Sequence, residues 1–387
     1  MEEIEETAIH NLQRVATAHS RQWLYLLGED GVVYSETRNL FAGLDAAGVS
    51  AYRAFDGGAS VQDLMKLDST SSSSNAQEDA LNAIYALSQG RFFTGGLANN
   101  LENEDPRTAW PPLDRPANAN LVLHDIPVFL EYSMGAPGEL CRDCFESCPA
   151  TTQAARCRMS AHYAEDGWAI HVNDRPLLSA LRAEQIGLGF LHAARSLLYA
   201  ESGYDIAFHA AMVTDRDRGV MLCAPREAGK STLAAYLAAH GYEFLADEPA
   251  LLRLDTASVT SLRLPISLKE GSWAVLQREW PQAAHAPIHL RSDGVRIRLL
   301  HAPQTRLSAR LTHIVFPCYD PAASTPAIEQ LTPLRTLSLL NDGGMLLGRD
   351  FARPAFEAFL RLICAVPAYA MRYASLDEAA RMIQAFP

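Results

Sequence analysis

The residues best suited to chemistry in this sequence form a short loop between an apolar strand and a helix. The loop and the residue after it read Ala224-Pro225-Arg226-Glu227-Ala228-Gly229-Lys230-Ser231-Thr232. Apolar residues 219–223 precede the loop and a helix predicted over residues 232–239 follows it, which is the context of the phosphate-binding pattern G-x-x-x-x-G-K-[ST]. In that pattern, backbone N–H groups and the positive end of the helix face the phosphates. We therefore predict that residues 224–232 bind ATP, with Lys230 at the β- and γ-phosphates and Ser231 at Mg²⁺.

One position of the loop departs from the pattern. Ala224 stands where the first glycine is usual, and a positive φ at that position would strain an alanine. The spacing, the strand and the helix all fit, so nucleotide binding is the expectation. The alternative is a decayed loop that binds nothing.

An acidic pair, Asp247 and Glu248, follows the loop at a short distance. Asp247 comes 17 residues after the loop lysine. The predicted helix over residues 231–239 carries the chain about 13 Å away from the loop at 1.5 Å per residue. Gly241 ends that helix, and residues 242–246 return about 16 Å as an extended strand. Asp247 is therefore expected level with the phosphates; the alternative is a solvated acidic pair at a strand end.

A histidine is predicted at the mouth of the same loop. Residues 205–213 and 219–223 flank the polar turn Asp215-Arg216-Asp217-Arg218, which predicts an antiparallel pair of strands. If that turn is symmetric, His209 lies opposite Ala224. A lone histidine in a strand can equally be structural, so position alone leaves both roles open.

Together these residues resemble those of the HPr kinase family, bacterial serine kinases whose nucleotide-binding fold is shared with phosphoenolpyruvate carboxykinase. That family has a His in the strand before the loop, then G-K-S, then an acidic strand end at this same separation; here the segments read FHAA, AGKST and FLADE. The resemblance covers residues 165–387 and implies an α/β catalytic domain that uses ATP and Mg²⁺. It implies that Asp247 is the general base and that Glu248 helps to hold the metal. His209 then tunes the base, beside Lys230 as a further catalytic residue.

Two features separate the chain from HPr kinases themselves. Glu248 replaces a second Asp, and the signature segment with a Glu-x-Arg-Gly core has no counterpart. The chain is more similar to HPr-kinase-related proteins of peptide-modification clusters, which include lasso-peptide kinases that phosphorylate a Ser of a precursor peptide. Residues 264–272, LPISLKEGS, match the segment that usually follows the acidic pair there. Lys269 is then a candidate contact for phosphate or substrate, with an exposed loop lysine as the alternative.

The N-terminal part is predicted to form a small α+β domain over residues 1–95. Residues 23–27 and 32–35 flank a turn rich in Gly and Asp and predict a hairpin, and residues 44–54 predict a helix. Together with residues 55–64, FDGGASVQDL, they resemble the hairpin, helix and D-G-x-x-[ST]-V step of PqqD-like peptide-recognition domains. That resemblance implies a winged-helix-like fold that binds a leader peptide as an added strand.

Four cysteines lie within residues 96–164, a stretch predicted to be a linker region between the two domains. They are Cys141, Cys144, Cys148 and Cys157. Four thiolates so close in sequence suit a tetrahedral structural Zn²⁺, although their spacing is not that of paired C-x2-C knuckles. The alternative is free thiols in a surface loop. The spacings run in the reverse order of the radical-SAM pattern, and no barrel pattern follows.

Composition narrows the class of protein. The chain has 387 residues and a formal net charge of −12, which argues against a duplex nucleic-acid binder. No apolar run approaches the about 18 residues that cross a bilayer, and the acidic N-terminus is unlike a secretory signal. The expectation is a cytoplasmic protein without nucleic-acid or membrane partners. A long amphipathic helix predicted over residues 177–200 is a candidate interface for a homo-oligomer.

The sequence as a whole predicts an α/β protein, because strands alternate with helices from residue 205 onward. The predicted function is transfer of the ATP γ-phosphate to a Ser or Thr hydroxyl of a peptide or protein, in the biosynthesis of a peptide natural product. One alternative is a kinase of small-molecule hydroxyls, whose N-terminal part is merely structural. The other is a non-catalytic nucleotide sensor or scaffold, in which Ala224 marks lost turnover.

Overall fold

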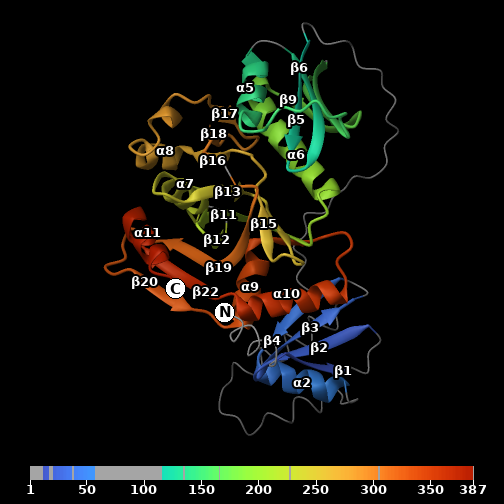
Figure 1. The fold of residues 1–387 in the computed structure, drawn as a ribbon, viewed down its shortest axis with the longest axis vertical. Coiled ribbons are helices and arrows are strands. Elements are labelled where there is room, and N and C mark those ends of the chain that lie inside the picture. The colour runs from blue at the N-terminus through green and yellow to red at the C-terminus, as the bar shows by residue number, and fades with distance from the viewer. Residues whose placement is uncertain are drawn as a thin grey trace.

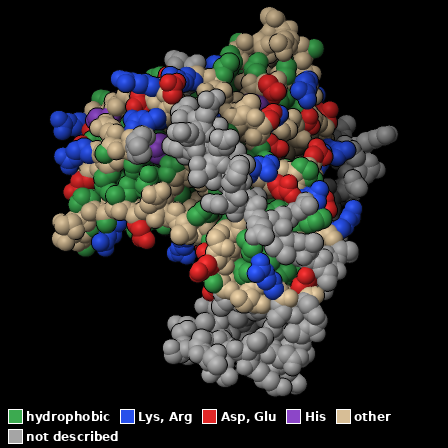
Figure 2. Space-filling view, turned by 60° about the horizontal axis from the view of Figure 1, so that its bottom comes forward, with side chains coloured by type: hydrophobic (Ala, Val, Ile, Leu, Met, Phe, Trp, Pro, Cys, Tyr) green, Lys and Arg blue, Asp and Glu red, His purple; other side chains and the backbone are tan. Residues whose placement is uncertain are grey.

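The structure is a computed structural model of mixed α/β architecture with several separate sheets. It describes residues 12–16, 21–36, 39–56, 116–133, 136–164, 166–225, 228–303 and 306–386. Three parts follow one another along the longest axis (Figure 1): a four-stranded N-terminal sheet at one end, a large central sheet, and a five-stranded sheet at the other end. On the face shown in Figure 2, Lys and Arg side chains are interspersed with Asp and Glu.

The central sheet divides into two arms at one long strand, β19 (Ser308–Tyr319). The strands of the first arm are β13 (Glu243–Asp247), β11 (Ala210–Asp215), β12 (Arg218–Cys223), β19, β22 (Ala368–Tyr373) and β20 (Ala327–Gln330). The strands of the second arm, which starts from the other end of β19, are β15 (Ser258–Thr260), β14 (Ala250–Arg253), β10 (Ile206–Phe208) and β21 (Met345–Leu347). β12 and β22 run parallel to β19, whereas β15 runs antiparallel to it.

Two chain segments cross from one arm to the other at the same level. β10 continues into β11 with His209 at the break, and β13 continues into β14 with Glu248 and Pro249 at the break. β10 pairs with β14 in the second arm, and β11 pairs with β13 in the first. His209 and Glu248 are therefore neighbours at the point where the arms separate. A point where a sheet divides is where α/β proteins form ligand-binding crevices.

Both faces of the first arm are buried along β11. Along β11, Met212 packs into one apolar cluster, and Ala211 and Val213 pack into another, as the alternation of side chains in a strand requires. Helices α9 (Pro333–Gly343) and α10 (Arg353–Ala365) contribute to the first cluster. Helices α7 (Lys230–Ala239) and α11 (Leu376–Gln384) contribute to the second. This burial fixes the loop between β12 and α7 on a rigid support.

The N-terminal sheet is an antiparallel meander followed by a helix. Its elements are β1 (Leu12–Ala16), β2 (Gln22–Leu27), β3 (Asp30–Ser35), β4 (Leu40–Leu44) and α2 (Ala46–Asp56). The predicted hairpin is confirmed as β2 and β3, and the predicted helix is confirmed except that Leu44 ends a strand. Residues 57–95 lie outside the described residues, so most of the PqqD-like step at residues 55–64 stays a prediction.

Aromatic side chains attach the N-terminal sheet to α10. Phe356 of α10 is fully buried and stacks on Tyr34, with ring centroids 4.3 Å apart and planes 10° apart. The ring of Tyr25 meets Phe356 edge-on at 5.5 Å, and Phe41 lies 5.4 Å away. The N-terminal sheet therefore shares a hydrophobic core with the central sheet.

We expect Phe356→Ala to destabilise the whole chain, because the cavity would lie between the two sheets. Truncating a buried Phe costs about 3–5 kcal/mol of unfolding free energy. Chemical denaturation followed by circular dichroism measures the loss. Tyr163→Ala is the matched control, since Tyr163 is 61% exposed and should change stability by less than about 1 kcal/mol. Equal midpoints for wild type and Phe356→Ala would show that this contact does not hold the sheets together.

Residues 116–181 form the five-stranded sheet. Its strands, in spatial order, are β5 (Pro116–Leu123), β6 (Ile126–Ser133), β7 (Cys157–Ala164), β8 (Gly167–Val172) and β9 (Arg175–Leu181). Helices α5 (Ala136–Phe145) and α6 (Ile186–Glu201) pack against it in one core. The boundary expected between residues 164 and 165 falls inside the β7–β8 hairpin. Residues 116–164, part of the stretch predicted as a linker, are thus three strands and a helix.

The helix predicted over residues 177–200 is wrong in its first part. Residues 175–181 form β9, and α6 begins only at Ile186, after the 3-10 turn η1 (Ala183–Gln185). Asn173 and Asp174 have φ values of 51° and 62°, and they connect β8 to β9 as a two-residue turn. Positive φ at both central residues is the mark of a tight hairpin. The turn therefore sends the chain straight back as a strand.

A three-stranded sheet completes the fold beside α7. Its elements are β16 (Ile266–Lys269), α8 (Glu270–Leu276), η2 (Pro281–Ala284), β17 (His289–Leu290) and β18 (Arg296–Leu300). β16 follows the acidic pair and contacts α7 directly, and Trp280 donates its indole N–H to the carbonyl of Ala235 in α7 at 2.9 Å. In Figure 1 this small sheet lies between the central and the five-stranded sheets.

Candidate functional site

The predicted loop connects the end of a strand to the start of a helix. β12 ends at Cys223 and α7 begins at Lys230, so the positive end of the helix faces the loop. Gly229 has φ +87°, a conformation that strains any other residue. Ala224 is buried and is not among the residues with positive φ. The alanine in place of glycine therefore causes no backbone strain here.

Two residues of the predicted loop, Arg226 and Glu227, lie outside the described residues. Pro225 and Ala228 flank them, and Ala228 donates its N–H to the carbonyl of Pro225 at 3.4 Å. Thr232 lies in the first turn of α7, and its hydroxyl is 2.7 Å from that of Ser272 at the start of α8. This contact joins α7 to the segment that follows β16.

Lys230 is buried, with only 4% of its surface exposed, and its ammonium group points back over the loop. Nζ donates to the carbonyl oxygens of Ala224 at 2.8 Å and Pro225 at 3.2 Å. It also lies 3.7 Å from Oε1 of Glu248. These partners satisfy a charge that would otherwise be costly to bury. They also hold the ammonium at the loop, where phosphates would bind.

Asp247 lies level with the loop, as its spacing predicts. Ser231 donates its hydroxyl to Oδ1 of Asp247 at 3.0 Å, and the backbone N–H of Ser267 donates to Oδ2 at 3.2 Å. Asp247 is only 3% exposed. Burial, and then the negative charge of Glu248, raise the pKa of Asp247 to about 6. A carboxylate with a pKa near neutrality is suited to accept a proton.

His209 lies beside Glu248 at the point where the two arms separate. Ala210 pairs with Cys223, so the next position along the register places His209 opposite Ala224, as predicted. Nε2 of His209 is 3.0 Å from Oε1 of Glu248. Glu248 itself has φ +48°, a strained backbone conformation that is common at functional sites.

The two carboxylates differ in their affinity for protons. Burial pushes the pKa of Glu248 up, but the hydrogen bond and charge of His209, and the charges of Arg195 and Lys230, outweigh it and hold the pKa low. Asp247 has the raised pKa. Neighbouring groups whose environments push their pKa values apart commonly take different roles in catalysis. Here Glu248 stays ionised while Asp247 is the more basic of the two.

Oxygen atoms at this site fit a magnesium ion. The hydroxyl of Ser231 contacts Asp247, and Glu248, the next residue in the chain, lines the same cleft as Ser231. Oxygen ligands of this kind are those that Mg²⁺ prefers in proteins.

The site opens into a cleft of about 1570 Å³, which sequence reasoning did not anticipate. One wall comes from β9 and α6, and the opposite wall from α7, α8 and the segment around β17. Lys269, predicted as a substrate or phosphate contact, lines the cleft at the end of β16. Arg195 and His192 of α6 line it as well, although they belong to the helix of the five-stranded sheet. The sequence signal that could have pointed to Arg195 and His192 is that both are polar residues, at helical spacing, on an otherwise apolar helix.

The structure does not assemble the predicted zinc site. The four residues proposed as ligands are Cys141, Cys144, Cys148 and Cys157. The thiols of Cys144 and Cys148 instead donate to the carbonyl oxygens of Gly187 at 3.0 Å and Arg263 at 3.6 Å. Burial raises the pKa of all four thiols, which opposes the thiolate form that zinc needs. Three of them are not in a surface loop either, because Cys141 and Cys144 lie inside α5 and Cys157 lies in β7, whereas Cys148 follows the end of α5.

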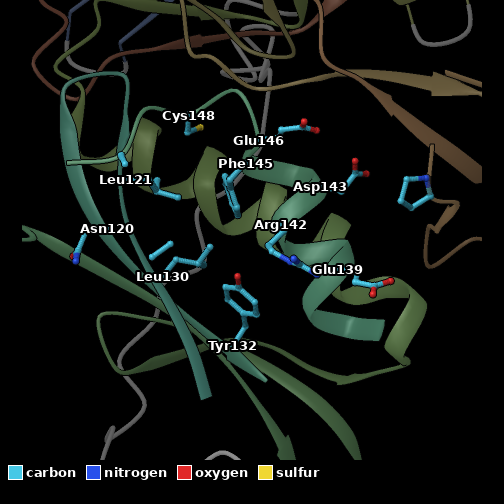
Figure 3. Close-up of a pocket in the computed structure, with 13 residues that line it drawn as sticks. Asn120, Leu121, Leu130, Tyr132, Glu139, Arg142, Asp143, Phe145, Glu146 and Cys148 are labelled. Atoms are coloured by element: carbon cyan, nitrogen blue, oxygen red, sulfur yellow. The ribbon is translucent and has the colours of Figure 1, made fainter. Parts of the chain in front are cut away.

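A different group of metal-ligating atoms lies at the end of α5. Asp143, Glu146 and His301 each offer one atom, and these atoms lie within 4.8 Å of one another. The hydroxyl of Ser147 is 2.8 Å from Nδ1 of His301, and the buried ring of His289 is 2.6 Å from Asp143. Figure 3 shows Asp143 and Glu146 at one side of a pocket of about 440 Å³ between α5 and the strands β5 and β6. These contacts join α5 to the three-stranded sheet.

Comparison with known proteins gives a distant likeness among solved structures. No family model matches the chain, and no curated protein matches it. Among solved structures, it is similar to the Hpr(Ser) kinase/phosphatase from Coxiella burnetii, with 10% sequence identity and a TM-score of 0.23, over 46% of this chain and 91% of that chain. A likeness at this level says nothing about function. In the described part of the chain, the helices are too short or too polar to span a membrane.

Proposed function

We propose that the chain is an ATP- and Mg²⁺-dependent kinase that transfers the γ-phosphate to a Ser or Thr hydroxyl of a peptide or protein. The observation that carries this proposal is that two carboxylates with different pKa values, those of Asp247 and Glu248, lie beside the loop. Ser231 bonds to Asp247, and Lys230 lies 3.7 Å from Glu248. A loop of this kind binds phosphates, and a buried carboxylate beside it can activate a hydroxyl.

The reaction follows from these positions. Asp247 takes the proton of the acceptor hydroxyl while the hydroxyl oxygen bonds to the γ-phosphorus of ATP. The bond from that phosphorus to the bridging oxygen breaks in line, and ADP leaves with the electron pair. Lys230 screens the β- and γ-phosphates, and His209 keeps Glu248 ionised. Ser231 and Glu248 would hold Mg²⁺, which would offset the negative charge of the phosphates.

The volume of the cleft favours a large acceptor. Its volume of about 1570 Å³ exceeds the roughly 300–1,000 Å³ of typical small-molecule pockets, which leaves room for a peptide segment beside a nucleotide. The resemblance to kinases of peptide-modification clusters agrees with such an acceptor. We therefore place the chain in the biosynthesis of a modified peptide. A small-molecule hydroxyl kinase is the competing function.

The N-terminal sheet is the proposed site for a leader peptide. β1 and β4 are the outer strands of this sheet as described, and an extended peptide can add to such an edge through main-chain hydrogen bonds. Binding there would raise the effective concentration of the acceptor hydroxyl at Asp247. The shared core around Phe356 means that removing residues 1–95 would expose apolar surface. The role of the sheet is therefore best tested with the full chain.

The test offers the full chain ATP, Mg²⁺ and candidate acceptors, with phosphate located by mass spectrometry. The acceptors are a precursor peptide encoded near this gene, the same peptide without its leader, and small alcohols. We expect phosphorylation of the leader-bearing peptide at one Ser or Thr, at least about tenfold faster than without the leader. Replacing that residue with Ala should remove the product. Phosphorylation of a small alcohol and of no peptide would favour the competing function.

The isolated leader, added in trans, provides the control for recognition. It should inhibit phosphorylation of the leader-bearing peptide and leave the slow reaction of the leaderless peptide unchanged, because it competes only for the recognition site. Equal inhibition of both reactions would place the leader in the catalytic cleft instead.

A further inference from the structure

We infer that Arg195 of α6 binds the transferred phosphate, so that the five-stranded part of the molecule supplies a catalytic residue to the loop. This inference rests on the proposed function. It adds a second cation that reaches the nucleotide from outside the domain that holds the loop, the acidic pair and His209.

The geometry of α6 places Arg195 in the cleft. One stripe of this helix and of the turn before it lines the cleft at helical spacing. Its members are Gln185, Leu188, Gly189, His192 and Arg195. Residues three and four apart share one face of a helix, so Arg195 continues a surface that already faces the loop. The same cleft is lined by Lys230, Ser231 and Glu248.

Arg195 is close to the acidic pair without being bonded to it. Burial raises the pKa of both Asp247 and Glu248, and for each of them the charge of Arg195 acts in the opposite direction. The guanidinium therefore lies within electrostatic range of both carboxylates. Among the described residues, however, Arg195 has no ion-pair partner, and its buried Nε has no hydrogen-bond acceptor.

A guanidinium in this position is suited to bind an anionic ligand. Buried polar groups in proteins are nearly always hydrogen-bonded, so an unpaired buried N–H is a sign of a missing partner. Arginine presents five donors in a planar fork that matches the oxygens of a phosphate. Lys230 already bonds to the loop carbonyls, and its ammonium group lacks the planar fork that would match two oxygens of the terminal phosphate. Arg195 is suited to that second contact.

The terminal phosphate is the group that gains most from this contact. In phosphoryl transfer, charge is spread over the three oxygens that do not react, and an arginine that binds them commonly accelerates the reaction by about 10³–10⁵-fold. ADP lacks this phosphate. A residue that binds it must therefore distinguish ATP from ADP, whereas a residue that only supports the acidic pair would affect both nucleotides alike.

The test measures the affinity of the full chain for ATP and for ADP, each with Mg²⁺, by equilibrium titration. We expect Arg195→Ala to weaken ATP binding about tenfold or more and to change ADP binding less than about twofold. Transfer to the acceptor should fall about a hundredfold or more. Arg156→Ala is the matched control: it removes the same charge from the same part of the molecule, where Arg156 forms an exposed ion pair with Glu201 at 3.4 Å. It should bind and transfer as wild type does.

Arg195→Lys keeps the charge and the fold of α6 but loses the planar fork. This variant tests the inference if the alanine variant does not fold. We expect it to reduce the preference for ATP over ADP several-fold. Equal losses for both nucleotides, or unchanged affinities, would overturn the inference. A wild-type chain that binds neither nucleotide would instead refute the proposed function itself.

Discussion

Replacing Lys230 with Ala is expected to abolish phosphate transfer. The ammonium group is the only Lys or Arg nitrogen that the described residues hold against the loop carbonyls, at 2.8 Å from Ala224 and 3.2 Å from Pro225. Without it, the β- and γ-phosphates would meet the carboxylates of Asp247 and Glu248 without the ammonium that lies 3.7 Å from Glu248. Removing an electrostatic contact of this kind costs about 10²–10³-fold in rate. Transfer of labelled phosphate from ATP to the acceptor peptide measures the loss.

The same change also has a structural consequence, which the control must separate from catalysis. The carbonyl oxygen of Ala224 would lose its donor, which costs about 1–3 kcal/mol when the group stays buried. Lys230→Met fills the same volume as the lysine stem and keeps the loop packed. We expect both variants to remain folded in thermal unfolding and both to lose transfer. Transfer at the wild-type rate in either folded variant would show that the loop is not a phosphate site.

Local sequence signals predicted the parts of the site that one stretch of chain builds. The loop, the return of the chain to Asp247 and the position of His209 opposite Ala224 all depend on a strand, a helix and a short turn that are neighbours in sequence. Their spacing fixes their geometry, because the rise per residue in helices and strands is constant. Nucleotide binding itself stays a prediction.

Contacts between elements that are far apart in sequence could not be predicted from local spacing. Arg195 lines the site because α6 packs on a separate sheet, and no spacing in the sequence encodes that packing. Cys141 and Cys157 are close in sequence, yet they lie in α5 and β7 of one apolar core. Proximity in sequence suggested a shared metal, whereas burial of each thiol among apolar side chains determined where they lie.

The misassigned helix shows how two local signals can conflict. The leucines at residues 177, 178 and 181 have helical spacing and favoured a helix. Asn173 and Asp174 form a two-residue turn with positive φ, which demands an immediate antiparallel strand. The turn prevailed because β8 pairs with β9 from Val172 opposite Arg175 to Trp168 opposite Leu181, with two register shifts between these ends.

Asp247→Asn is expected to separate binding from chemistry. The amide keeps the shape of the carboxylate and can still accept from the hydroxyl of Ser231, but it cannot take a proton from the acceptor. Loss of a general base lowers the rate by about 10²–10⁴-fold. We therefore expect ATP affinity within a few-fold of wild type and transfer reduced at least about a hundredfold, measured by titration and by single-turnover phosphate transfer.

Glu248→Gln is the matched control, because it removes the same charge from the neighbouring residue. Glu248 is held ionised by His209 at 3.0 Å, so its expected role is to hold the metal rather than to take the proton. This variant should need more Mg²⁺ for nucleotide binding, whereas Asp247→Asn should not.

The Asp247→Asn change also affects stability. The new amide would place one N–H toward the donor N–H of Ser267 unless it turns, and that conflict costs about 1 kcal/mol of stability. If Asp247→Asn lost ATP binding and transfer together while staying folded, Asp247 would be a metal ligand, and the base would have to be sought among the other groups that line the cleft.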